Sequence, residues 1–259
     1  MRVGGFRWGQ AGGLPLLRVA AMESAGRVLA VFTSRRGGDS RFPFGELNLG
    51  EGVGDRVAAV AANRKQLLTA LELGAATVVW AEQVHGSRVC RVEKTPRACP
   101  QADALISDQP GVILGGVFAD CVPVFVYDPR RPAVGLAHAG WRGTAAGVVQ
   151  RTLEAMAAHF GTAPDRCVAA VGPSIGPCCY QVGEEVLRRL RDALPWDAEL
   201  LRSGRLDLGE LNARVLEHCG VPQVNRAELC TSCNRELFFS HRRDGGRTGR
   251  MAALVGILP

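Results

Sequence analysis

Apolar runs of strand length alternate with longer stretches of helical periodicity along this chain, and this alternation constrains the fold more than any other feature. The helical stripes, with apolar residues three or four apart, lie at 57–71, 149–160, 182–194 and 208–219. The strand candidates are 28–32, 77–80, 88–92, 112–118, 122–127, 133–137, 168–171, 223–229 and 251–257. Nothing resembling a linker divides the chain. We therefore predict a single α/β domain with a central mixed sheet flanked by helices.

The first 26 residues are Gly-rich and weakly patterned. We expect residues 1–26 to form a loosely attached N-terminal extension and residues 27–259 to form the domain. Within the domain, Asp207 with Glu210 three residues later resembles a capping box for the fourth helix, and Gly220 is placed to end it.

Charge and composition narrow the classes of partner. The net charge of +6 comes from 31 basic residues against 25 acidic ones, and nearly all the basic residues are Arg. Guanidinium groups suit bidentate capture of phosphate or carboxylate, and the chain has no helix-turn-helix, zinc-finger or aromatic RNA-binding signature. We expect a small anionic ligand and no nucleic-acid partner.

Apolar segments long enough to cross a membrane are not found in the sequence, and the start of the chain lacks the order of regions of a signal peptide. We therefore expect a cytoplasmic protein with no membrane partner. The nine cysteines are odd in number and fit no disulfide framework, so we expect reduced thiols.

Two histidines and one cysteine lie at the ends of predicted strands, where ligand sites of α/β domains gather. His85 and His138 each follow a strand, and Cys121 begins one. Two imidazoles and a thiolate would give zinc three protein ligands and leave a fourth position open. Alternatively, Cys121 is a nucleophile with His138 as its base, and Asp120 orients the imidazole or binds substrate. The residues alone leave both interpretations open.

Two Gly-rich arginine clusters could hold an anion. One is the turn Thr33-Ser-Arg-Arg-Gly-Gly-Asp-Ser40, and the other spans residues 242–250. Four further cysteines are interpreted as structural thiols. Cys178 and Cys179 are adjacent, which suits neither an easy disulfide nor two ligands on one ion, and Cys230 and Cys233 form only half of a zinc motif.

Taken together, the motifs resemble one family. The runs TSRRGGDS, NLGEGVGD, WAEQVHG, ADALISDQPG, FADCVPV, GLAHAGWRGT, VGPSIGPCCYQVGEEV and CTSCNRELFFSHRRDGGRTGRMA occur in this order between Arg27 and Leu258. They resemble the multicopper polyphenol oxidase (laccase-domain) family, whose bacterial members are called YfiH-like or peptidoglycan-editing factor and are described as purine nucleoside phosphorylases. The resemblance implies a single α/β domain of the kind shared with cysteine-hydrolase toxins.

By this resemblance, His85, Cys121 and His138 correspond to zinc ligands. The implied activities are phosphorolysis of adenosine, inosine, guanosine and methylthioadenosine, with orthophosphate as co-substrate, and hydrolytic deamination of adenosine. Arg35 matches an arginine of the family pattern, and Arg142 and Arg243 are the other candidates for holding phosphate. The alternatives are a Cys–His amide hydrolase acting on peptidoglycan precursors and a non-catalytic zinc-binding partner of cell-wall enzymes.

The name of the family suggests copper chemistry, which the histidine count can test. A multicopper oxidase needs a His2Cys copper and a trinuclear cluster with many more imidazoles. Five histidines cannot supply these ligands. We therefore expect zinc, with copper only as an adventitious occupant.

Overall fold

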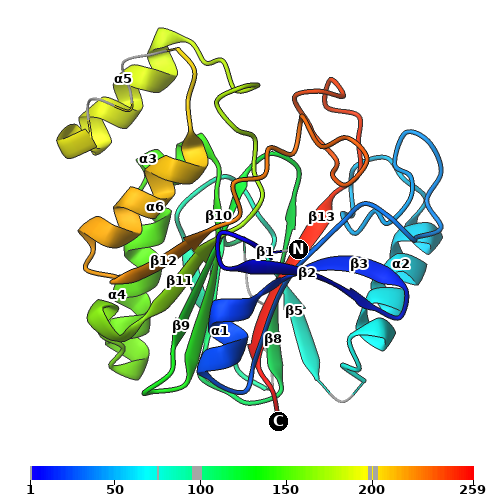
Figure 1. Ribbon diagram of the computed structural model, residues 1–259, viewed down its shortest axis with the longest axis horizontal. Helices are drawn as coiled ribbons and strands as arrows, with labels where there is room; N and C mark the ends of the chain where they lie inside the picture. The colour runs from blue at the N-terminus through cyan, green and yellow to red at the C-terminus, as the bar shows by residue number, and fades with distance from the viewer. Residues whose placement is uncertain (1, 75, 95–100, 198–199, 201–203) are drawn as a thin grey trace.

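The computed structural model describes residues 2–74, 76–94, 101–197, 200 and 204–259. Two mixed β-sheets lie side by side in the centre of the molecule, with helices on the outside (Figure 1). The strand order is β1-β2-β3-β4-β13-β8-β5 in the first sheet and β12-β11-β9-β10-β7-β6 in the second. The predicted α/β domain is confirmed, but its apolar runs are shared between two sheets instead of one central sheet.

Each strand predicted from an apolar run lies on a strand of the structure. The first sheet consists of β1 (Arg2–Val3), β2 (Phe6–Ala11), β3 (Leu14–Val19), β4 (Val28–Thr33), β5 (Thr77–Trp80), β8 (Val112–Phe118) and β13 (Met251–Ile257). The second consists of β6 (Val89–Arg91), β7 (Ala104–Ser107), β9 (Val122–Asp128), β10 (Ala133–Ala139), β11 (Val168–Val171) and β12 (Gln223–Arg226). The pairs β5 with β8, β6 with β7, and β11 with β12 are parallel, and the other pairs are antiparallel.

With the exception of Ala20–Ala25, whose Met22 is buried between the two sheets, the helices in the described part of the chain lie on the outer faces of the sheets. The helices are α1 (Ala20–Ala25), α2 (Val57–Ala70), α3 (Trp141–Ala145), α4 (Val148–Phe160), α5 (Glu184–Ala193) and α6 (Leu208–His218). The predicted cap of α6 is confirmed, because the Asp207 carboxylate accepts a hydrogen bond of 2.8 Å from the Glu210 amide. Apolar residues of α4, α5 and α6 pack on the second sheet, whereas Leu67 of α2 packs on the first.

The largest apolar cluster lies between the two sheets. Phe32 and Met251 of the first sheet and Phe125 and Leu136 of the second belong to it, and each is at most 3% exposed. Burial of aromatic and aliphatic side chains from both sheets holds them together, at roughly 25 cal/mol for each Å² of apolar surface. This packing therefore fixes the position of one sheet relative to the other.

The N-terminal residues differ from the prediction of a loosely attached extension over residues 1–26. The strand β3 pairs with both β2 and β4, so this segment extends the first sheet. Phe6, Leu17, Val19 and Met22 are all 0% exposed and belong to the cluster between the sheets. The glycines of two tight turns, with positive φ at residues such as Gly12, dilute the apolar pattern and hide the hairpin from sequence analysis.

Cys90 corrects a second expectation, because it is disulfide-bonded and not a reduced thiol. The cysteines described as free thiols are Cys121, Cys167, Cys178, Cys179, Cys219, Cys230 and Cys233.

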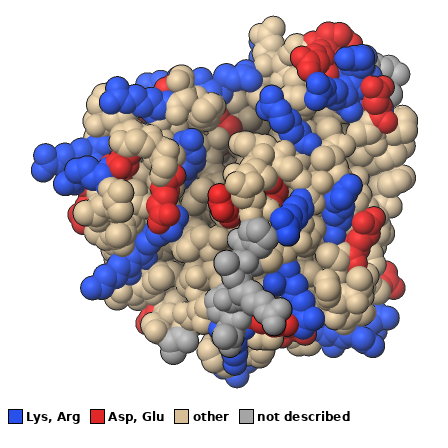
Figure 2. Space-filling model, turned by 180° about the vertical axis from the view of Figure 1, so that it is seen from behind, with Lys and Arg blue, Asp and Glu red and all other residues tan. Residues whose placement is uncertain are grey.

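Surface charge is dispersed over the face seen in Figure 2. Lys and Arg side chains alternate there with acidic and uncharged ones, so the excess of arginine does not gather into one large positive patch on this face. Among the helices in the described part of the chain, none is long and apolar enough to cross a membrane.

Candidate functional site

Two imidazoles and one thiol meet where the two sheets come together. His85 lies in the loop after β5, Cys121 lies between β8 and β9, and His138 is in β10. Their potential ligand atoms all lie within 4.8 Å of one another. The structure thus brings together the three residues singled out in the sequence, and we call them the His85–Cys121–His138 triad.

A buried carboxylate contacts the imidazole of His138 and the backbone of His85. Asp103 Oδ1 lies 2.8 Å from Nδ1 of His138 and accepts a 2.9 Å hydrogen bond from the amide of His85. Its Oδ2 accepts further hydrogen bonds from the amides of Val84 and Gly86. These contacts hold His85 in a left-handed conformation, with φ 59°. Because an ionised carboxylate only accepts hydrogen bonds, His138 donates from Nδ1, and Nε2 carries the lone pair whenever the imidazole is neutral.

The electrostatics of the triad favour an ionised thiol. Burial opposes ionisation of Cys121, but the charge of His138 and hydrogen bonds from both imidazoles outweigh it and lower the pKa of Cys121 to about 6. For His138, burial also opposes the charged form, yet Cys121 and Asp103 raise its pKa to about 9. Burial likewise acts against Asp103, whose pKa is nevertheless lowered by the hydrogen bonds from His138 and Gly86. The three groups form a chain of mutually stabilised charges.

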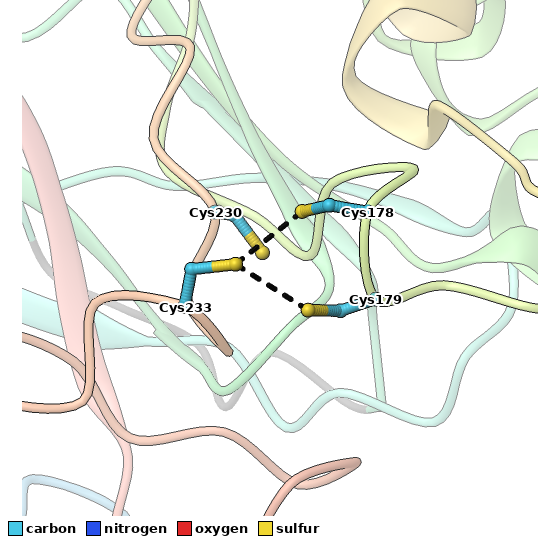
Figure 3. A group of neighbouring side chains, drawn as sticks. All are labelled: Cys178, Cys179, Cys230 and Cys233. Atoms are coloured by element: carbon cyan, nitrogen blue, oxygen red, sulfur yellow. Dashed lines mark hydrogen bonds between the residues drawn. The ribbon is translucent and has the colours of Figure 1, made fainter.

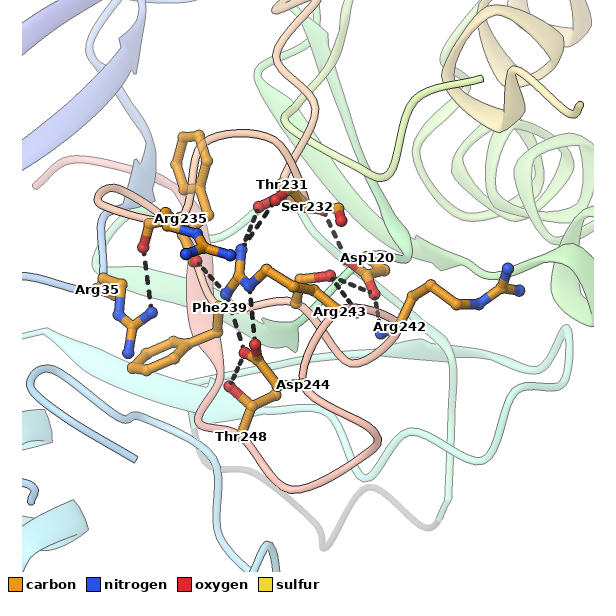
Figure 4. A network of polar contacts seen from close by, with 12 residues as sticks. Arg35, Asp120, Thr231, Ser232, Arg235, Phe239, Arg242, Arg243, Asp244 and Thr248 are labelled. Atoms are coloured by element: carbon orange, nitrogen blue, oxygen red, sulfur yellow. Dashed lines mark hydrogen bonds and ion pairs between the residues drawn. The ribbon is translucent and has the colours of Figure 1, made fainter. Parts of the chain in front are cut away.

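Asp120 does not orient the imidazole, contrary to the alternative interpretation of the sequence. Its carboxylate accepts hydrogen bonds from the Thr231 hydroxyl at 2.6 Å, the Ser240 hydroxyl at 3.0 Å and the Arg242 amide at 2.6 Å (Figure 4). Asp120 therefore joins the loop before β9 to the C-terminal loops. Asp103 has the orienting position instead.

The triad opens into a cavity of about 470 Å³. This volume is within the range of roughly 300–1,000 Å³ for small-molecule sites. Residues from both sheets and from the C-terminal loop line it: Glu51, Val53, Gln83, His85, Val117, Ala119, Asp120, Cys121, His138, Gly140, Trp141, Arg142, Ile175, Tyr180, Leu208, His241, Arg242 and Arg250. The wall thus combines metal-ligating groups, aromatic rings and guanidinium groups.

Three arginines line this cavity, and each is anchored differently. The guanidinium of Arg142 stacks on Trp141, with its carbon 4.4 Å from the ring centroid. Arg242 lies over Tyr180 at 4.9 Å and donates a 2.8 Å hydrogen bond to the Gln181 carbonyl. Arg250 donates to the carbonyls of residues 248 and 249, and burial lowers its pKa.

Of the arginines predicted to hold phosphate, Arg142 lines the cavity, whereas Arg35 and Arg243 lie outside its wall. Arg35 donates hydrogen bonds to the carbonyls of Gly45 and Arg235 and stacks on Phe239. Arg243 donates to Asp244 and to the carbonyls of residues 231, 232 and 238. Figure 4 shows Arg242 and Arg243 extending in opposite directions from adjacent positions. With these contacts, Arg35 and Arg243 lie in the wall of a separate cavity of about 480 Å³.

Sequence reasoning missed several residues of the site. Asp103 precedes a short buried strand that was not predicted, so nothing drew attention to its carboxylate. Arg242 and Arg250 lie in the C-terminal arginine cluster and His241 directly precedes it, and all three line the cavity. The sequence correctly indicated that this arginine cluster contributes to the cavity. Which of its arginines line the cavity depends on the conformation of the loop, which the sequence does not show.

Comparison with known families gives a consistent result. A family model described as multi-copper polyphenol oxidoreductase laccase matches residues 29–258. The chain is 42% identical to a Geobacillus stearothermophilus protein named purine nucleoside phosphorylase YlmD, over 93% of each chain. It is 37% identical to the Escherichia coli purine nucleoside phosphorylase YfiH, over 89% of this chain and 94% of that protein.

Solved structures agree with the sequence comparisons. The crystal structure of YlmD from Geobacillus stearothermophilus superposes with a TM-score of 0.89 at 40% identity, covering 94% of this chain and 96% of that one. The crystal structure of the hypothetical protein YfiH from Bacillus licheniformis gives a TM-score of 0.87 at 39% identity, covering 93% and 96%. The similarity extends over nearly the whole chain, and the family match over residues 29–258 includes all three residues of the triad.

Proposed function

The chain belongs to the multi-copper polyphenol oxidoreductase laccase family, and within this family we propose that it is a zinc-dependent purine nucleoside phosphorylase. One observation carries the proposal: a single cavity holds a His–Cys–His triad, three arginines and two aromatic side chains. The triad could bind the metal, the arginines could bind phosphate, and the aromatic side chains could stack on the purine base. The names of the relatives point to the same activity.

The triad fits zinc in its donor chemistry. Zinc prefers imidazole nitrogen and thiolate sulfur, and sites with three protein ligands leave one position open. A carboxylate that fixes the imidazole of a ligand is the usual outer contact of such sites, and Asp103 makes this contact with His138. When bound, zinc supplies a Lewis acid that polarises a substrate group and lowers the pKa of water.

Orthophosphate is held by the arginines of the cavity. Charge-assisted, bidentate hydrogen bonds make guanidinium groups good phosphate ligands. Arg142, Arg242 and Arg250 line the same cavity as the triad, and Arg142 is exposed, so its guanidinium is accessible to an incoming anion. We assign phosphate binding to these residues in place of Arg35 and Arg243.

The purine nucleoside occupies the aromatic and apolar part of the wall. Trp141 and Tyr180 offer flat faces, and Val117 and Ile175 add apolar surface. In phosphorolysis, a phosphate oxygen forms a bond to C1′ of the ribose while the bond from C1′ to the purine nitrogen breaks. The purine leaves with the electron pair and takes up a proton. The products are the free base and ribose 1-phosphate.

The proposed substrates are adenosine, inosine, guanosine and methylthioadenosine, which share this purine–ribose bond. The same cavity would deaminate adenosine when water replaces phosphate, because water adds at C6 and ammonia leaves. We propose the cytoplasm as the compartment, since both substrates are metabolites of the cell interior.

The test is to incubate the purified protein with adenosine in the presence and absence of phosphate, before and after chelation. We expect adenine and ribose 1-phosphate with phosphate, slow formation of inosine without it, and loss of both activities after metal removal. Cleavage of the nucleoside bond at full rate by chelated protein would contradict a zinc-dependent phosphorylase.

The relay from Cys121 through His138 to Asp103 favours one alternative, a Cys–His amide hydrolase. The lowered pKa of Cys121, about 6, and the raised pKa of His138, about 9, describe a thiolate–imidazolium pair suited to nucleophilic attack. Metal-loaded protein that is inert toward purine nucleosides, together with chelator-resistant cleavage of a peptidoglycan-precursor amide, would favour this hydrolase over the phosphorylase.

A further inference from the structure

Four cysteine side chains converge at a second place in the molecule. Cys178 and Cys179 lie in the loop between β11 and α5, and Cys230 and Cys233 lie in the loop after β12. Their sulfurs point toward one another (Figure 3) and all lie within 4.8 Å. Cys178 and Cys230 line a different cavity from the one that contains the triad. We call this group the four-cysteine cluster.

Backbone hydrogen bonds explain why the two loops meet. Ser174 and Cys230 form an isolated parallel bridge, in which the Ser174 amide donates to the Leu229 carbonyl and the Thr231 amide donates to the Ser174 carbonyl. The cluster therefore rests on an ordered pairing of main chains and is not a chance approach of mobile side chains.

A tight turn corrects the sequence expectation about the adjacent cysteines. Amides of Cys179 and Tyr180 both donate to the Gly176 carbonyl, at 3.0 Å each. In an extended strand, neighbouring side chains would point to opposite sides. The turn instead aims both Cys178 and Cys179 at Cys233, so the adjacent pair supplies the second half of a motif that looked incomplete.

The spacing of the sulfurs matches a single tetrahedral ion. Cys178 Sγ and Cys179 Sγ each lie 3.4 Å from Cys233 Sγ. A Zn–S distance of about 2.3 Å places the sulfurs of a tetrahedral site about 3.8 Å apart. An iron–sulfur cluster needs its cysteine sulfurs further apart, because the inorganic core lies between them.

The surroundings of the cluster favour bound thiolates over four thiols. The Gly176 amide donates a hydrogen bond of 3.3 Å to Cys230 Sγ, a contact typical of the second shell of metal sites. Arg205 donates from its guanidinium to the Cys178 carbonyl at 3.0 Å and places a positive charge beside the cluster.

We propose that Cys178, Cys179, Cys230 and Cys233 form a second metal centre, a structural tetrathiolate site for Zn²⁺ that is separate from the triad. Its role follows from what the two loops carry. The Ile175 amide donates to the Asp120 carbonyl, and Thr231 donates to the Asp120 carboxylate. Zinc at the cluster fixes both loops against the segment that holds Cys121.

Metal content tests the proposal most directly. In a Cys121→Ser background, which removes the thiolate of the triad, protein loaded with Zn²⁺ and desalted should retain about one equivalent. Adding Cys230→Ser and Cys233→Ser should lower this content at least tenfold. The matched control is Cys219→Ser, a free thiol outside both groups, which should leave the content unchanged. Equal zinc content with and without Cys230 and Cys233 would overturn the proposal.

Alkylation of the natural chain provides a test that needs no variant. Cys178 and Cys233 are exposed, so iodoacetamide can reach both sulfurs when no metal covers them. We expect Zn²⁺ to slow their alkylation at least tenfold and chelation to restore it, as measured by peptide mass spectrometry. Fast alkylation in zinc-loaded protein would overturn the proposal, as would a disulfide between two cysteines of the cluster found by peptide mapping.

Discussion

Two buried aspartates lie near the triad, and their hydrogen bonds assign them different tasks. Asp103 contacts the His138 imidazole and the amides of the His85 loop, whereas Asp120 contacts hydroxyl groups and an amide of the C-terminal loops. Only Asp103 fixes the tautomer of a proposed ligand. At the scale of single residues, the position of a carboxylate, and not its burial, determines its role.

The first prediction is that Asp103→Asn weakens zinc binding at the triad by about 10- to 100-fold, the usual effect of losing such an outer contact. An amide cannot stabilise the imidazole as a carboxylate does, and it can present a donor to Nδ1. Competition with a chromogenic chelator measures the affinity. Asp103→Glu should restore part of it, and Asp120→Asn should leave the triad's affinity within a few-fold of the natural protein's. Full affinity in Asp103→Asn would contradict the positioning role.

A second prediction separates arginines that bind phosphate from arginines that hold loops. Arg142→Ala should raise the phosphate concentration needed for phosphorolysis about 10- to 100-fold, since a charge-assisted contact contributes roughly 1.5–3 kcal/mol. It should spare deamination, which uses water. Arg35→Ala should leave the phosphate dependence unchanged and instead destabilise the fold by about 1–3 kcal/mol, because its carbonyl partners lose their donors. Steady-state kinetics measures the phosphate dependence, and urea unfolding measures the stability. The opposite pattern in the two variants would indicate that Arg35, and not Arg142, binds phosphate.

At the scale of elements, the N-terminal hairpin is part of the first sheet, and a third prediction follows from its burial. Leu17 is 0% exposed and packs between the sheets. Leu17→Ala should therefore reduce the free energy of unfolding by about 2–5 kcal/mol, the usual loss for a buried leucine. Val57→Ala is the control, because Val57 is 81% exposed and its truncation should change stability by less than about 0.5 kcal/mol. Urea denaturation measures both, and a neutral Leu17→Ala would restore the picture of a dispensable extension.

A fourth prediction concerns Asp244 in the C-terminal loop, whose hydrogen bonds should make the stability of the protein depend on pH. Burial acts against ionisation of Asp244, but hydrogen bonds from Arg243 and Thr248 outweigh it and lower the pKa of Asp244. A carboxylate with a lowered folded pKa stabilises the protein fully above its unfolded pKa of about 4, and this stability is lost as the pH falls through the folded value. Asp244→Asn should therefore flatten the stability profile below about pH 4 and leave its slope at pH 6–8 unchanged. If the free energy of unfolding falls as steeply below about pH 4 in Asp244→Asn as in the natural protein, Asp244 does not contribute to the acid sensitivity.

How far the sequence predicts the structure depends on whether a segment's signal is local. The strand β8 and the helix α4 are long and regularly patterned, so periodicity alone located them. The strand β7 (Ala104–Ser107) is buried, but its only large apolar residues are Leu105 and Ile106, which give too weak a local signal. The four-cysteine cluster was missed for another reason, since its halves are brought together by main-chain pairing between distant loops. His85, Cys121 and His138 were found because their residue types are rare and chemically distinctive.

At the scale of the whole molecule, the triad joins the two sheets, and the four-cysteine cluster joins two loops of the second sheet. His85 follows a strand of the first sheet, whereas His138 lies in the second, so a metal at the triad links layers that otherwise meet through apolar contacts. Ligands that bind only the folded state stabilise it by an amount set by their concentration relative to Kd. Metal binding at either site should therefore be visible in the stability of the entire fold.

The final prediction uses this linkage to count the sites. With free Zn²⁺ at 100 times the Kd of a site, each site should add about 2.7 kcal/mol to the free energy of unfolding. Because the triad and the cluster share no ligands, their contributions should add, and the natural chain should gain about 5.4 kcal/mol when both are saturated to this level. Cys121→Ser and Cys233→Ser should each remove about half of the zinc-dependent gain, and the double variant should respond to zinc no more than chelated protein does. Urea titrations at fixed free Zn²⁺ measure these differences. A zinc-dependent gain that disappears completely in Cys121→Ser would mean that the triad is the molecule's sole stabilising zinc site.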